Sequence, residues 1–274
     1  MNKGILAAIG FGLFSSVSSA GVISYTDFSD LSNIQLNGHA QILSPNADNI
    51  LRLTNSTGQA SSAFWLDPFN LADNVSFSAI FSFRIHSNIN GGADGLTFTL
   101  QPNSNTAGSA GGGMGYLGIP NSLGIEFDTW DNGAGDGYNS NHVGINLNGD
   151  INSVLRASSP FQLDGGEVFT SWIDYDGLSN LLEVRLSNNS VRPLDALLGY
   201  SIDLSQVFGA TDLFVGFTSA TGWAGSTHDI LSFEFADRYA PISSVGASAV
   251  PEPASLAMLG FGVLGLAFSR RRKS

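Results

Sequence analysis

Residues 123–147 read LGIEFDTWDNGAGDGYNSNHVGINL, with two partly apolar segments on either side of a polar loop. Apolar and polar side chains alternate in both flanking segments, 123–130 and 142–147, which is the period of a β-strand with one buried face. The loop between them, 131–141, is rich in Asp, Asn and Gly, and these residues favour turns. The stretch therefore predicts a β-hairpin.

The alternation also assigns a face to each side chain of this hairpin. Ile125 and Phe127 are expected to point into the core, so Glu126 and Asp128 share the opposite face, one pleat repeat apart. The apolar residues of the second strand face inward as well, which turns His142 toward the two carboxylates.

The hairpin thus gathers four metal-ligating side chains at one spot: Glu126, Asp128, Asp136 and His142. Like-charge repulsion makes such a group costly unless cations sit in it. Oxygen-only ligands suit calcium, whereas a mixed carboxylate and imidazole set suits manganese or a similar transition metal. The alternative is that Asp and Asn are ordinary turn residues and that His142 is a packed polar side chain.

Alternation with a period of two continues through the rest of the chain. The segments that show it are 75–85, 96–100, 182–186, 213–217 and 231–235. No long segment has a helical period, and clusters of Gly, Asn, Ser and Asp separate the strands. Many antiparallel strands in one domain of this length predict an all-β sandwich of two large antiparallel sheets.

The motif Glu-Phe-Asp-Thr-Trp at 126–130, followed by Asn132, Asp136 and His142-Val-Gly-Ile, resembles the double-metal signature of the legume lectins, also called L-type lectins. The resemblance implies a concanavalin-like jelly-roll sandwich that binds Ca²⁺ and Mn²⁺ or another transition metal. By position, the transition metal is held by Glu126, Asp128, Asp136 and His142. Calcium is held by Asp128, Asn132, Asp136 and the carbonyl of Trp130. The chain departs from plant members in that Gly137 replaces the usual Pro and the spacing from Asp136 to His142 is one residue longer, a difference that concerns the second metal and not calcium.

The resemblance extends to four loops that form a sugar site around the calcium, with motifs in the expected order from about Phe28 to Phe235. The segment 93–96, Ala-Asp-Gly-Leu, is similar to the family loop whose cis Ala-Asp peptide presents an Asp to two sugar hydroxyls. A Gly-rich loop at 111–118 is similar to the loop whose backbone N–H reaches the sugar. The implied sugar-binding residues are Asp94, Gly115, Asn132, Gly222, Trp223 and Ala224.

These loop assignments have alternatives. The glycines at 111–118 are also compatible with a flexible loop or a phosphate cradle, although no Lys follows them. Trp223 is either a platform that stacks on a pyranose ring or a core tryptophan. Galactose-like and mannose-like ligands are both compatible with the sequence.

A glycoside hydrolase on the same sandwich is the rival function, because such enzymes also carry a Glu-x-Asp strand. Retaining hydrolysis needs two carboxyl groups about 5 to 5.5 Å apart. Glu126 and Asp128 share a face, but Thr129-Trp130-Asp131 follows where the hydrolase pattern has a further Glu. With no cysteine and no Ser, His and Asp set at an elbow turn, we expect a carbohydrate-binding protein and not an enzyme. A structural matrix protein that binds no sugar is the third reading.

The net charge of the domain differs from that of the two ends of the chain. Between Ala20 and Val250 there are six Arg, no Lys and 22 acidic residues, a net charge of −16. Such a domain repels nucleic acid, and bound cations offset part of its charge. An exported chain without cysteine has no disulfides, but roughly 225 residues bury an adequate core without them.

Both ends of the chain have the pattern of processing signals. Residues 1–20 carry Lys3, an apolar run and small residues ending at Ala20, which predicts a secretory signal peptide. The apolar run is too short for a transmembrane anchor. The legume-lectin-like domain is then expected at 21–236, followed by a Ser-, Ala- and Gly-rich linker at 237–249.

The segment 250–274 combines Pro251-Glu252-Pro253, a short apolar stretch at 254–268 and a basic cluster at 270–273. It resembles the PEP-CTERM sorting signal, which implies transient anchoring in the inner membrane, cleavage by an exosortase-type enzyme and delivery to the cell surface or the exopolysaccharide matrix. The alternative is a permanent C-terminal anchor, with the basic cluster on the cytoplasmic side. Family members often pair sheets edge to edge, so a homo-oligomer is also an expectation.

Overall fold

The computed structural model describes residues 22–44, 49–71, 75–106, 108 and 113–244. The expected signal peptide and sorting signal lie outside the described residues, as do Gly111 and Gly112 of the Gly-rich loop. The boundaries expected for the domain and the linker stay predictions. In the described part of the chain, β1 begins at Val22 and β16 ends at Ala236.

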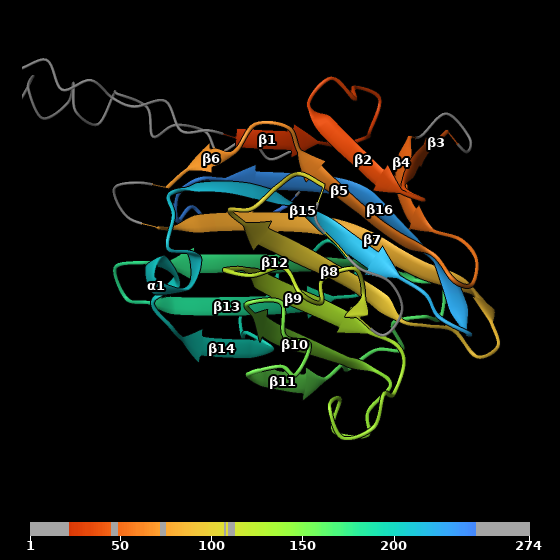
Figure 1. The fold of residues 1–274 in the computed structure, drawn as a ribbon. Helices are drawn as coiled ribbons and strands as arrows, with labels where there is room; N and C mark the ends of the chain where they lie inside the picture. The colour runs from red at the N-terminus through yellow and green to blue at the C-terminus, as the bar shows by residue number, and fades with distance from the viewer. Residues whose placement is uncertain (1–21, 45–48, 72–74, 107, 109–112, 245–274) are drawn as a thin grey trace, which may run out of the picture.

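The domain is a sandwich of two antiparallel sheets, each with eight strands, as the alternation predicted (Figure 1). The first, called the β7 sheet, has the order β14-β13-β12-β7-β16-β4-β3, with β1 paired to β16. Its strands are β1 (Val22–Tyr25), β3 (Gln41–Leu43), β4 (Ile50–Thr54), β7 (Phe77–Ile89), β12 (Val168–Asp176), β13 (Leu181–Ser187), β14 (Leu198–Ser201) and β16 (Gly225–Ala236).

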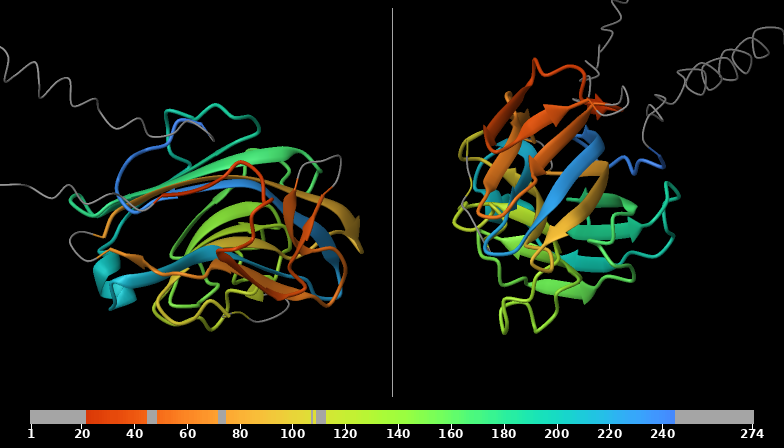
Figure 2. Two further views of the ribbon diagram at one scale, coloured as in Figure 1. Left: turned by 90° about the horizontal axis from the view of Figure 1, so that it is seen from above. Right: turned by 90° about the vertical axis from the view of Figure 1, so that its right-hand side faces the viewer.

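The second, called the β9 sheet, has the order β11-β10-β9-β8-β15-β5-β2, with β6 paired to β15. Its strands are β2 (Ile34–Gly38), β5 (Ala60–Trp65), β6 (Phe69–Asn70), β8 (Gly95–Gln101), β9 (Leu123–Asp128), β10 (His142–Leu147), β11 (Leu155–Ser158) and β15 (Asp212–Ala220). The described residues contain one short helix, α1 (Leu204–Phe208), capped by the side chain of Asp203. Figure 2 shows the two sheets as stacked layers.

Phenylalanine rings join the two layers. Phe81 on β7 lies 5.7 Å from Phe127 on β9 and 5.0 Å from Phe217 on β15, measured between ring centroids. These separations are typical of favourable aromatic pairs. All three rings are fully buried, so the inward-facing positions of the predicted strands do form the core.

Strand bounds differ slightly from the sequence-based expectation. The strand predicted at 75–85 begins two residues later and continues to Ile89, where its side chains become exposed. The last stretch, Ser87 to Ile89, is polar or open to solvent, so its alternation carries little hydrophobic signal. This extension brings the end of β7 to the loops that contain the candidate site.

Candidate metal centre and adjoining loops

The hairpin of β9 and β10 gathers the predicted ligands. In its ladder His142 is the partner of Asp128, and Gly144 is the partner of Glu126. Ligand atoms of Glu126, Asp128 and His142 lie within 4.8 Å of one another, and all three side chains are buried. The structure thus brings these three predicted ligands together, and their role as metal ligands stays a prediction.

Glu126 is held from several sides. Its Oε1 atom lies 3.2 Å from Nε2 of His142 and accepts a hydrogen bond from the hydroxyl of Ser153, and its Oε2 accepts one from Nδ2 of Asn146 at 2.5 Å. A Cβ atom on Gly144 would lie 2.2 Å from Oε1. Any larger residue at this rung of the ladder would therefore displace the carboxylate of Glu126.

The hydrogen bonding of His142 fixes its tautomer. Its Nδ1 atom lies 2.9 Å from the backbone carbonyl of Asn139, an acceptor, so Nδ1 carries the proton. Nε2 then points at Oε1 of Glu126, to which it donates when protonated and beside which it is a metal ligand when it is not. A cation between the two side chains would use both atoms as ligands.

Electrostatics at the hairpin also favour a cation. Burial raises the pKa of Asp128 well above its ordinary value, and the neighbouring carboxylates of Glu126, Asp136 and Asp94 raise it further. The backbone N–H of Trp130, which donates to Oδ1 of Asp128 at 2.8 Å, opposes the shift. A metal ion removes the repulsion that disfavours the charged forms.

Asp136 lies on the loop beside the group of three and is not part of it. Its Oδ2 atom accepts a hydrogen bond from the backbone N–H of Asn132 at 2.5 Å, and its side chain is buried. It is close enough to raise the pKa of both Asp94 and Asp128. The 131–141 loop thus places Asp136 between the hairpin and the neighbouring loop.

Asp94 is the last residue of this neighbouring loop, directly before β8, and the Ala93–Asp94 peptide is cis, as the resemblance implied. Its backbone N–H donates to the carbonyl of Ala220, and its own carbonyl accepts from the N–H of Thr129. The side chain is buried, and its Oδ2 atom is unpartnered among the described residues. Burial, together with Asp136, raises the pKa of Asp94 to about 6, and the backbone N–H of Gly222 opposes the shift.

The remaining predicted sugar-site residues differ in burial and backbone conformation, and one of them, Gly222, lies near this carboxylate. A Cβ atom on Gly222 would lie 3.9 Å from Oδ2 of Asp94. Trp223 is 75% exposed, so the alternative of a core tryptophan is wrong, whereas Ala224 is buried. Gly115 adopts φ +68°, and a Cβ there would come within 3.0 Å of the carbonyl oxygen of Ser61.

Sequence reasoning missed several supporting side chains. Asn146 shares the face of His142 and Gly144 by simple alternation, so the period of the strand contained a signal for it. Ser153 had no such signal, because it comes from the connection after β10. Asn90 was also missed, although its Nδ2 donates to the carbonyl of Trp223 at 2.9 Å and so fixes the tryptophan loop.

The profile of the legume lectin domain matches residues 22–251. The chain belongs to the legume lectin family. Its lectin domain is 34% identical over 191 residues to the L-type lectin-domain containing receptor kinase VIII.1 of Arabidopsis thaliana, covering 66% of this chain and 26% of the kinase. The putative receptor kinase I.10 of the same plant is 30% identical over 83% of this chain and 40% of its own length. The chain spans about a quarter to two fifths of these relatives.

Solved lectin structures show the same sandwich. The basic winged bean lectin with Tn-antigen superposes with a TM-score of 0.68 and 28% identity, covering 80% of this chain and 98% of that lectin. The lectin from Bauhinia forficata in complex with GalNAc superposes with a TM-score of 0.67 and 26% identity, covering 80% of this chain and 98% of that lectin.

The profile of the PEP-CTERM protein-sorting motif matches residues 249–273, which confirms the second resemblance. This motif overlaps the last residues of the lectin match and lies outside the described part of the chain. Within the described ranges, no helix has the length and apolar character needed to span a membrane.

Proposed function

We propose that this legume lectin domain is an exported carbohydrate-binding protein whose sugar site depends on bound Ca²⁺ and a second divalent metal. The observation that carries the proposal is the carboxyl group of Asp94. It is buried and has an unpartnered oxygen, and the same Asp136 that borders the acidic hairpin raises its pKa. A saccharide hydroxyl is a donor that satisfies such an oxygen.

The donor sets fit two different ions. Glu126, Asp128, Asp136 and His142 would hold the transition metal, since they combine carboxylates with an imidazole. Oxygen donors from Asp128, Asn132, Asp136 and the carbonyl of Trp130 would hold calcium. When bound, the ions supply positive charge that neutralises the carboxylates and keeps their loops in place.

The sugar site would adjoin these residues. Asp94 would accept hydrogen bonds from two sugar hydroxyls, the backbone of Gly115 would approach the sugar closely, and Asn132 would serve both calcium and the ligand. Trp223 offers an exposed aromatic face beside Gly222 and Ala224. Because the Bauhinia and winged bean lectins were solved with GalNAc and Tn-antigen, these saccharides are the first probes.

The burial of the hairpin carboxylates argues against the hydrolase alternative. Glu126 and Asp128 are both almost fully buried. Glu126 already contacts His142, Asn146 and Ser153, so a glycosidic oxygen has no access to it. Acid catalysis requires hydrogen-bond reach to the leaving group.

Location follows from the two processing signals. The sorting motif implies export and exosortase processing, and residues 1–20 would direct the export. The protein would be held briefly at the inner membrane and then act at the cell surface or in the exopolysaccharide matrix. No nucleic acid partner fits a domain with a net charge of −16.

A glycan array run in Ca²⁺ and Mn²⁺, after a chelator, and after both metals are restored tests this function. We expect binding that is lost on chelation and returns with the metals. Equal binding in all three conditions contradicts the proposal. Release of reducing sugar from polysaccharide would instead support a hydrolase, and metal-independent self-association without glycan binding would support a structural protein.

A further inference from the structure

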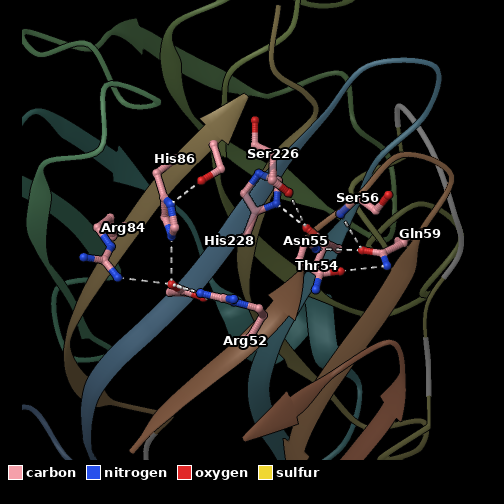
Figure 3. Close-up of polar contacts among 11 residues, drawn as sticks. Arg52, Thr54, Asn55, Ser56, Gln59, Arg84, His86, Ser226 and His228 are labelled. Atoms are coloured by element: carbon pink, nitrogen blue, oxygen red, sulfur yellow. Dashed lines mark hydrogen bonds and ion pairs between the residues drawn. The ribbon is translucent and has the colours of Figure 1, made fainter. Parts of the chain in front are cut away.

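A cluster of two arginines and a histidine occupies the outer face of the β7 sheet, away from the acidic hairpin. It centres on Asp229, whose side chain is fully buried. Arg52 binds both carboxylate oxygens, at 2.7 and 2.9 Å, and Nε2 of His86 lies 3.0 Å from Oδ2. Arg84 makes the longest contact, 3.4 Å (Figure 3).

The cluster holds more positive charge than Asp229 neutralises. Two guanidinium groups and an imidazole surround one carboxylate, and Arg52 alone already contacts both of its oxygens. The side chains of Arg52, Arg84 and His86 are 18%, 32% and 25% exposed, so solvent reaches them. We call these three residues the basic cluster.

His228 lies beside the basic cluster in Figure 3 but does not add to its charge. It is fully buried, and burial lowers its pKa to about 3. Its Nδ1 atom lies 2.5 Å from the hydroxyl of Thr54. The surplus charge therefore belongs to the exposed side chains.

By contrast, two other arginines, Arg185 and Arg192, are matched by two acids. Arg185 lies 3.1 Å from Glu183 and 3.8 Å from Asp174, and Arg192 also pairs with Asp174. In a domain with six Arg and no Lys, the basic cluster concentrates a third of the permanent positive charge. A structural ion pair alone does not call for this surplus.

The basic cluster is close to the candidate sugar loops along the chain. Arg84 is five residues before Ile89, where β7 ends beside the Asp94 loop, and Asp229 is four residues after Gly225, which follows Trp223 and Ala224. At about 3.3 Å per residue, the separation along either strand is roughly 13–17 Å. A polymeric saccharide is long enough to contact both places.

We propose that the basic cluster is a second, metal-independent contact that binds the carboxylate groups of an acidic polysaccharide. The inference rests on the proposed function in that the ligand is a saccharide, but it uses none of the metal or sugar-site residues. Guanidinium groups pair well with planar carboxylates. Screening limits the repulsion from distant acids of the domain, because the Debye length is about 8 Å at physiological ionic strength.

Linked contacts of this kind raise the overall affinity. A uronate-bearing chain held at the Asp94 site presents its further carboxylates to the basic cluster at a high effective concentration. Neutral glycans gain nothing from the cluster. The protein would therefore favour acidic over neutral polysaccharides that carry the same terminal sugar.

The test uses the metal-stripped full-length protein, in which the Asp94 site is inactive, with an oligogalacturonate and its fully methyl-esterified form as probes. Arg84→Gln is the variant, because Arg84 is the most exposed member and makes the weakest contact with Asp229. Arg238→Gln is the matched control, since Arg238 is also exposed but lies beyond the far end of β16. Thermal unfolding verifies that both variants are folded.

We expect the wild type and Arg238→Gln to bind the oligogalacturonate, and Arg84→Gln to bind it roughly tenfold more weakly, the loss typical of one charge-assisted hydrogen bond. Binding should weaken with added NaCl and be absent for the ester. Equal binding by Arg84→Gln and the wild type, or equal binding of the acid and the ester, overturns the inference. Competition by acetate at the same carboxylate concentration would also overturn it, because the site would then take any small carboxylate.

Different results contradict the proposed lectin site and the proposed role of the basic cluster. With Ca²⁺ and Mn²⁺ restored, Arg84→Gln should bind a neutral glycan as well as the wild type does. Loss of neutral-glycan binding in the wild type contradicts the proposed lectin site but leaves the result in chelator unaffected. Loss of neutral-glycan binding in Arg84→Gln alone contradicts the independence of the basic cluster.

Discussion

The Nε2 atom of His142 lies 3.2 Å from Oε1 of Glu126, across two neighbouring strands of one hairpin. Because Nδ1 of the same ring faces the carbonyl of Asn139, Nε2 is the nitrogen that points at the carboxylate. The contact therefore joins two groups that a metal ion can bind together. It is the most direct structural reason to expect a second metal beside calcium.

His142→Gln should lower the affinity for Mn²⁺ by at least about 10- to 100-fold, since removing even an outer-shell partner of a ligand has this effect. Isothermal titration of the metal-stripped protein measures the change. His39→Gln is the control, because His39 is exposed and contacts only the carbonyl of Ala60 among the described residues. Unchanged Mn²⁺ affinity in His142→Gln would remove the imidazole from the ligand set.

Gly144→Ala should disturb the same centre through sterics. The added Cβ would lie 2.2 Å from Oε1 of Glu126 and from the hydroxyl oxygen of Ser153, so the carboxylate must move. We expect a loss of roughly 1–3 kcal/mol in unfolding free energy, as for other overpacked sites, together with weaker metal binding. Chemical denaturation and metal titration measure the two effects.

Gly199→Ala is the matched control for this substitution. Gly199 is also on a strand, β14, and an added Cβ there meets no described atom within 4 Å. Its stability should change by no more than about 0.5 kcal/mol. Similar behaviour of the two variants would mean that the Glu126 carboxylate is free to move.

Asp94→Ala should abolish sugar binding while the domain remains folded. The carboxylate is buried among other acids and has a raised pKa, so it contributes no net charge stabilisation to the metal-free fold. Glycan titration and thermal unfolding in Ca²⁺ measure the two properties. Asp67→Ala removes an exposed acid elsewhere and should leave both unchanged. Wild-type sugar affinity in Asp94→Ala would contradict the assigned site.

The sequence allowed the sandwich and the hairpin to be predicted because both depend on local alternation. Glu126, Asp128 and His142 followed from the strand period alone, and the structure places them together. Two features depend instead on segments far apart in the chain, and no local pattern indicates them. The first is the support of Glu126 by Ser153, and the second is the contact of Asp229 with Arg52 and His86, more than 140 residues away.

The sequence did not decide whether Trp223 is exposed, again because the answer depends on segments far apart in the chain. A tryptophan next to a glycine loop fits a core position or a surface platform equally well, since burial depends on which segments cover it. The structure leaves it exposed, whereas Trp172, on a regular strand, is fully buried. Alternation assigns a face to a strand residue but says nothing about a residue in a loop.

The buried ring of His228 makes the unfolding free energy of the domain depend on pH. Burial lowers its pKa to about 3, whereas the unfolded chain takes up this proton near pH 6.5. Between these values acid favours the unfolded chain, so the stabilising effect of the neutral ring is complete above pH 6.5 and decreases as the pH falls toward 3. The limiting slope for one such group is about 1.4 kcal/mol per pH unit.

Between pH 6.5 and 4, the unfolding free energy of His228→Gln should rise less steeply with pH than that of the wild type, by up to about 1.4 kcal/mol per pH unit, because its amide does not titrate. Asp94 and Asp128 have raised pKa values and act with the opposite sign in this window, but they are common to both proteins and cancel in the difference. Asp229 does not contribute to the pH dependence between pH 6.5 and 4. Its pKa is lowered, so the stability that its charged form provides is lost only below the ordinary carboxyl range. Burial opposes that lowering, but the hydrogen bonds from Arg52 and His86 outweigh it. Urea denaturation of the metal-stripped protein at several pH values measures the slopes, with His39→Gln as the control. Parallel curves for His228→Gln and the wild type would show that the buried ring takes up its proton in the folded domain.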